Sequence, residues 1–143
     1  MFKSKVDCVS FNLQVGKTLE ETVEMILRLM GYQTKASTTL HTRKPYIHAE
    51  VHHPKGKKRF LIECMQHIEG LVGIKEVERF CAQTAHAREK AQADAGLLVS
   101  NTGFSPEAIS WCAKNCSFVQ LKTYGQIISK SANVRKLQRR FNM

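Results

Sequence analysis

The chain has 143 residues, of which 43% are hydrophobic and 24% are charged. These proportions are close to those of globular proteins and exclude a globally disordered chain, and the length suits one domain with its own core. The 22 Lys and Arg residues outnumber the 12 Asp and Glu residues, which gives a formal net charge of +10. A field of this sign attracts polyanions such as nucleic acid or acidic lipid, and the charge alone does not choose between them.

The cysteines and the apolar runs indicate the compartment. Five cysteines, an odd number at irregular spacings, do not have the pattern of a disulfide framework. The first residues contain no apolar run of signal-peptide length, and about 18 apolar residues never occur in succession. We therefore expect a soluble cytoplasmic protein with reduced thiols and no membrane partner.

The first half of the chain predicts one helix followed by strands. Thr18 to Glu21 fits a capping box, and apolar residues then recur at helical spacing until Gly31, which predicts a helix over 18–30. Strands are expected at 32–38, 44–51 and 59–65. The turn at 54–57 would join the last two strands into a hairpin.

The second half alternates helices and strands. Apolar residues on one face predict a helix over about 73–91, with Lys75 and Arg79 off that face. Ser105, Pro106 and Glu107 are typical of a helix start. The remaining elements are expected as a buried strand at 96–100, a helix from Ser105 to about 114, a strand at 117–121 and a short helix at 124–129. The order predicts a single α/β domain over 1–130 with a mixed sheet, followed by a basic C-terminal tail at 131–143.

One ionisable residue lies inside an apolar strand. Glu63 and Met65 share one face of the strand at 59–65, because side chains alternate. Glu50, in the partner strand, is expected roughly opposite and would present a second carboxylate to the same point. Two neighbouring carboxylates repel unless a cation lies between them, so the pair predicts a Mg²⁺ site.

Several motifs occur in a fixed order along the chain. They are Leu19-Glu20, Arg28-Leu29-Met30-Gly31-Tyr32, the hairpin with Glu50, Leu61-Ile62-Glu63-Cys64, Val72-Gly73-Ile74-Lys75-Glu76-Val77, and Leu98-Val99-Ser100-Asn101-Thr102-Gly103-Phe104-Ser105-Pro106-Glu107-Ala108. Over about residues 16–128 this ordered set resembles the Mrr-type restriction endonuclease domain of the PD-(D/E)xK nuclease superfamily. The resemblance implies a restriction-endonuclease-like mixed sheet with helices on both faces, and Mg²⁺-dependent cleavage of double-stranded DNA.

The resemblance also assigns roles to single residues. It implies that Glu20 is the first-helix acid, that Glu50 and Glu63 hold the metal, and that Met65 stands where the family has a lysine. A thioether carries no proton and no charge, and losing a positioned proton-transfer group typically costs ~10² to 10⁴ in rate. Lys75, in the following helix, is the candidate substitute.

Each of these residues also has a purely structural interpretation. Glu63 could pair with Arg59 or a lysine, Met65 is expected to fill the core, and Glu20 suits the first turn of any helix. The basic run in the hairpin is expected to contact DNA beside the site; it comprises Lys55, Lys57, Lys58 and Arg59.

Three hypotheses of function follow. The leading one is a DNA-binding protein on an Mrr-like fold with a degenerate catalytic site. The first alternative is an active Mg²⁺-dependent endonuclease with a substitute lysine, so the sequence leaves enzymatic activity open. The second is an interaction or regulatory scaffold, with a co-encoded NTPase or helicase as its partner. A homodimer is compatible with each hypothesis, and the sequence does not decide the oligomeric state.

Overall fold

The computed structural model describes residues 19–38, 45–67 and 69–129. The expected capping residue Thr18 and the basic tail at 131–143 lie outside these ranges. The elements, in chain order, are α2 (Leu19–Leu29), β1 (Gln33–Thr38), β2 (Pro45–His53), β3 (Gly56–Met65), α3 (Ile74–Glu89), β4 (Ala95–Ser100), α4 (Pro106–Asn115) and β5 (Val119–Thr123). A further helix occupies residues 124–129.

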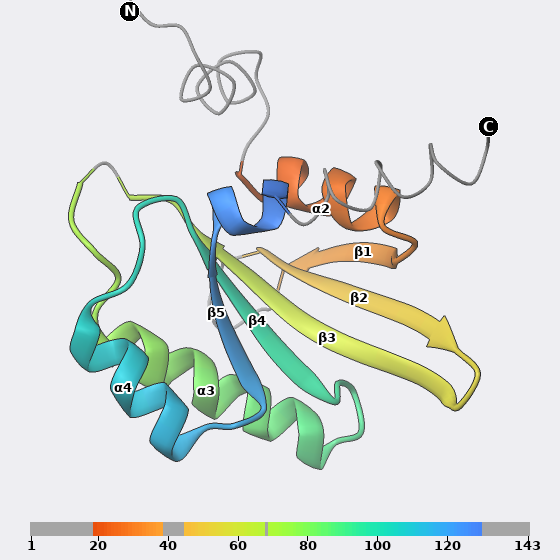
Figure 1. Ribbon diagram of the computed structural model, residues 1–143. Coiled ribbons are helices and arrows are strands. Elements are labelled where there is room, and N and C mark those ends of the chain that lie inside the picture. The colour runs from red at the N-terminus through yellow and green to blue at the C-terminus, as the bar shows by residue number, and fades with distance from the viewer. Residues whose placement is uncertain (1–18, 39–44, 68, 130–143) are drawn as a thin grey trace, which may run out of the picture.

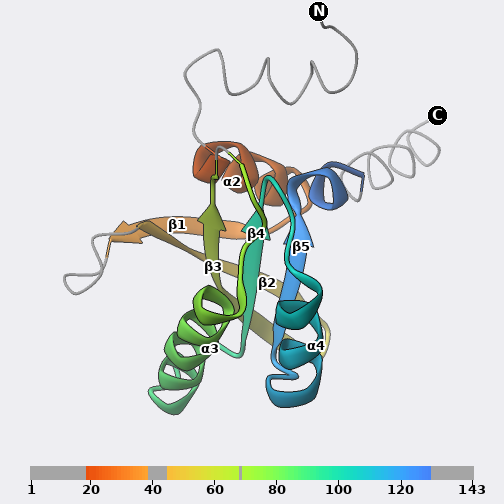
Figure 2. The same ribbon diagram turned by 90° about the vertical axis from the view of Figure 1, so that its left-hand side faces the viewer.

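The strands form one five-stranded sheet in the order β1-β2-β3-β4-β5. The pairs β1–β2 and β2–β3 are antiparallel, whereas β3–β4 and β4–β5 are parallel. The sheet twists so strongly that β1 runs almost across β3, β4 and β5 in Figure 2. Each parallel pair needs a crossover, and α3 and α4 supply the two crossovers on the same face.

Helices cover both faces of the sheet. Figure 1 shows α3 and α4 on one face and α2 with the helix at 124–129 on the other. Two apolar cores fill the spaces between these layers, one between α3, α4 and the sheet and one between α2, the helix at 124–129 and the sheet. Alternate residues of β3 serve the two cores, so Leu61 and Met65 face α3 whereas Ile62 faces α2.

The expected α/β fold, with a mixed sheet between helices, is confirmed, and the local signals explain why. The Ser105 hydroxyl accepts a hydrogen bond from the Ala108 amide at 3.1 Å and starts α4 with Pro106 in its first turn. Gly31, after α2, has a φ of 97°, which only glycine adopts at little cost. Within the described ranges, no helix is long and apolar enough to cross a membrane.

Candidate functional site

Glu63 lies on the face of β3 that is covered by α3 and is only 1% exposed. Arg79, on α3, donates to both of its carboxylate oxygens, from Nη2 to Oε2 at 2.8 Å and from Nη1 to Oε1 at 3.1 Å. A two-pronged guanidinium–carboxylate contact is the strongest common geometry for an ion pair. The buried carboxylate is therefore neutralised by a cation from the protein itself.

Two polar side chains extend this ion pair. Arg79 Nη1 also donates to Gln83 Oε1 at 3.1 Å, and the Tyr46 hydroxyl of β2 donates to the same oxygen. The hydrogen bonds to Glu63 raise the pKa of Arg79 above its already high ordinary value. The network joins β2, β3 and α3 and holds the guanidinium over Glu63.

Met65 follows Glu63 on the same face of β3. Its side chain is 6% exposed and belongs to the core under α3 and α4, as expected for a core-filling residue. No proton or positive charge can come from this position. The buried, flexible thioether instead fills the space between strand and helix.

Glu50 does not lie where the sequence analysis placed it. In the antiparallel register it pairs with Arg59, four residues before Glu63, which in a strand corresponds to a separation of ~13 Å. Its carboxylate contacts His52 Nε2 at 2.9 Å and Lys57 Nζ at 3.6 Å. The expectation that Glu50 and Glu63 share one point is therefore wrong. Continuing the register by one residue from Ile47 and Ile62 places Tyr46, and no acid, across from Glu63.

The other two expected site residues lie on helices. Glu20, at the start of α2, is half-buried, and burial raises the pKa of its carboxyl, with smaller contributions from Glu21 and Glu63. Lys75 is exposed on α3, one helical turn before Arg79, and no hydrogen bond or ion pair joins it to another described residue.

The described residues do not fit a Mg²⁺ ion. Magnesium requires several oxygen ligands in near-octahedral geometry, usually with one or two carboxylates. Both oxygens of Glu63 are occupied by Arg79, and Glu50 lies on another part of the hairpin. Over residues 19–38, 45–67 and 69–129, His, Cys, Asp and Glu side chains nowhere gather in a group of three that could hold a metal.

The structure divides the basic hairpin residues between two faces. Lys57 and Arg59 lie on the face of Glu50, whereas Lys58 turns to the other face, with its Nζ 5.2 Å from the centre of the Phe60 ring. Arg59 is bound to Asp94 through its backbone amide at 2.8 Å and its guanidinium at 3.4 Å.

The hairpin tip is also far from Glu63. Gly56, where β3 begins, is seven residues from Glu63, or ~23 Å along a strand. Figure 1 shows the tip projecting beyond the helices at the other end of the strand. The expectation that the run lies beside Glu63 is therefore wrong.

Arg79 was not among the expected site residues, because its spacing puts it off the apolar face of its helix. Arg79 lies at the border of that face, beside the fully buried Phe80, and its long side chain reaches under the helix to the strand. The sequence did indicate that Glu63 has a cationic partner, because a buried acid in an apolar strand requires one. The choice of Arg79 over Arg59 depended on the packing of α3.

A family model described as restriction endonuclease matches residues 13–131. The chain belongs to this family. A comparison with curated proteins gave no match.

Solved structures share the fold of this restriction endonuclease domain. The DNA modification-dependent restriction endonuclease AspBHI superposes with a TM-score of 0.58 at 17% identity, over 75% of this chain and 28% of that one. EndoMS in its apo form superposes with a TM-score of 0.54 at 14% identity, over 75% of this chain and 45% of that one. The MspJI restriction endonuclease in complex with a 27-mer oligonucleotide superposes with a TM-score of 0.52 at 17% identity, over 83% of this chain and 27% of that one. This chain thus spans less than half of each of these three proteins.

Proposed function

We propose that this restriction endonuclease domain binds double-stranded DNA and that its catalytic centre is degenerate. The observation that carries the proposal is the buried pair of Glu63 and Arg79, with the apolar Met65 beside it. Cleavage by the family needs a metal-bound water and a cation near the developing charge. In this chain the acid expected to hold the metal is bound instead by an arginine.

The case for DNA as partner combines family and charge. Of the similar structures, one is a DNA modification-dependent restriction endonuclease and another is a complex with an oligonucleotide. The net charge of +10 has the sign that phosphates attract.

That charge is unevenly distributed along the chain. The described residues hold twelve of the 22 Lys and Arg residues but eleven of the 12 Asp and Glu residues, so they are almost neutral. The segments 1–18, 39–44 and 130–143 together carry the other ten cationic side chains and one acid. We therefore expect these segments, with Lys55 and Lys57 at the hairpin tip, to supply most of the binding to phosphates.

Binding of a labelled 30-base-pair duplex at several salt concentrations tests this function. Removing one cation that binds a phosphate should reduce the slope of log affinity against log salt by ~1. Lys57→Ala is expected to lower the slope in this way, whereas Lys114→Ala, on the distant helix α4, should leave it unchanged. Replacing Arg135, Lys136, Arg139 and Arg140 by Gln should reduce the slope further. Binding without salt dependence, or no binding, would favour the scaffold hypothesis.

The active-enzyme alternative has one feature in its favour. Lys75 is exposed on the same helix as Arg79 and lies one turn before it, so it is the lysine on α3 that is placed to serve the site. That alternative predicts plasmid cleavage that is lost in both Lys75→Ala and Glu63→Gln. Our proposal predicts that wild type and both variants behave alike.

A further inference from the structure

A cavity of about 690 Å³ lies on the face of the sheet opposite α3 and α4. Its floor comes from β3, β4 and β5, and its walls from the end of α2 and the helix at 124–129. Most of the lining is apolar, including Leu27, Tyr32, Phe60, Ile62 and Leu97. This volume and this composition are typical of small-ligand sites.

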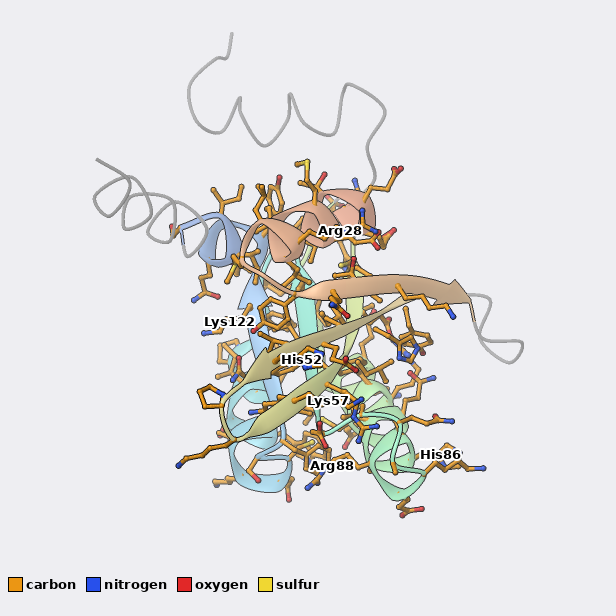
Figure 3. All side chains as sticks on the ribbon, turned by 90° about the vertical axis from the view of Figure 1, so that its right-hand side faces the viewer. Arg28, His52, Lys57, His86, Arg88 and Lys122 are labelled. Atoms are coloured by element: carbon orange, nitrogen blue, oxygen red, sulfur yellow. The ribbon has the colours of Figure 1, made fainter. Side chains whose placement is uncertain are left out.

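Among the residues that the structure describes, one charged side chain lines this cavity. Lys122, on β5, is partly buried, and within the described part of the chain it forms no hydrogen bond or ion pair. Figure 3 shows it on β5, close to the helix that follows that strand. None of the described residues lining the cavity is acidic. A partly buried lysine without a counter-charge at an apolar cavity favours a ligand that brings the negative charge.

One wall of the cavity is aromatic. The rings of Tyr32 and Phe60 meet edge to face, with centroids 6.0 Å apart. Aromatic rings pack favourably against such a pair in stacked or edge-on geometry. Gln120 and Gln126 add amide groups at the rim, which can donate hydrogen bonds to an anionic group.

We propose that this cavity binds a small aromatic acid, with its ring between Tyr32, Phe60 and Leu97 and its acidic group at Lys122. The site is separate from Glu63 and Arg79, which face α3 on the other side of the sheet. Ligand binding here therefore does not depend on whether the domain cleaves or binds DNA.

The following segment of the chain is a poorer occupant on grounds of charge. Residues 130–143 follow Ser129, which lines the cavity, in the sequence, and they carry five Lys and Arg residues but no acid. Bringing this segment to Lys122 would place like charges together. An anionic ligand has no such penalty.

Two ligands with the same ring and opposite charge test the proposal. 2-Naphthoate and 2-naphthylmethylammonium are titrated into the full chain by calorimetry, and amide NMR shifts locate the site. We expect saturable one-to-one binding of the naphthoate, about tenfold or more tighter than the ammonium compound, because a charge-assisted hydrogen bond contributes that much. The shifts should gather at the residues that line the cavity, which lie at 27–32, 60–62, 97 and 120–127.

A matched pair of variants isolates the charge. Lys122→Met keeps the length of the side chain and should weaken naphthoate binding about tenfold, removing the preference for the anion. Lys114→Met removes one charge from the opposite face and should change nothing. Equal binding of the two ligands, shifts away from the residues that line the cavity, an unaffected Lys122→Met variant or no saturable binding would each overturn the proposal.

Discussion

Replacing Arg79 by methionine should destabilise the fold more than any surface charge change. Glu63 is 1% exposed and would lose two hydrogen bonds, of 2.8 and 3.1 Å, to a charged donor. Breaking a buried ion pair from one side typically costs 3–5 kcal/mol, since it leaves a buried charge without a partner. The Arg79 side chain is 33% exposed, so water can reach part of the site. We therefore expect the low end of that range, about 3 kcal/mol.

Urea unfolding followed by circular dichroism measures this loss. Lys114→Met, which removes a cation from the exposed face of α4, is the control and should change the free energy of unfolding by no more than about 0.5 kcal/mol. The double variant Glu63→Met with Arg79→Met leaves no unpaired charge and should be more stable than Arg79→Met alone. The importance of this ion pair would be refuted if Arg79→Met lost no more unfolding free energy than the control. It would also be refuted if the loss in the double variant equalled the sum of the losses in Glu63→Met and Arg79→Met.

Two other changes test the packing and the electrostatics. Gly96→Ala would place a Cβ 2.6 Å from Thr84 Oγ1 and 2.9 Å from the Phe80 ring. This overlap should lower the free energy of unfolding by about 1–3 kcal/mol. The control is Gly125→Ala, where only Thr123 lies within 4 Å of the added Cβ, and it should not destabilise the fold. The Arg59 backbone amide, helped by its guanidinium, lowers the pKa of Asp94. The stability that Asp94 contributes should therefore be present above about pH 4, the unfolded pKa, and be lost as pH falls through the lowered folded pKa. Thermal unfolding of wild type and Asp94→Asn between pH 2 and 7 should show a modest difference at neutral pH that vanishes in acid; a constant difference would contradict this origin.

The order of helices and strands could be predicted because each element carries its own local signals. Ser105 and Pro106 start α4 in the structure as the sequence indicates, and the apolar run at Leu97 and Leu98 becomes the buried strand β4. Such signals depend on neighbouring residues only. They can therefore be recognised in the sequence without knowledge of the tertiary structure.

The geometry of the candidate site could not be predicted, because it depends on distances between residues that are far apart in the sequence. The position of Glu50 relative to Glu63 follows from the hairpin register, in which Glu50 pairs with Arg59. The turn residues identified the hairpin but left open which residues lie opposite one another. The partner of Glu63 likewise depended on how α3 packs on β3, because Arg79 lies at the edge of an amphipathic face.

We propose that this restriction endonuclease domain binds DNA without cutting it. The most direct test is conversion of supercoiled plasmid to nicked or linear DNA, with Mg²⁺ or Mn²⁺, at protein concentrations that saturate DNA binding. We predict that wild type produces no more cleavage than Glu63→Gln purified in parallel. Robust cleavage by wild type that is abolished in Glu63→Gln would contradict this proposal, because it would require Glu63 to leave Arg79 and serve in catalysis.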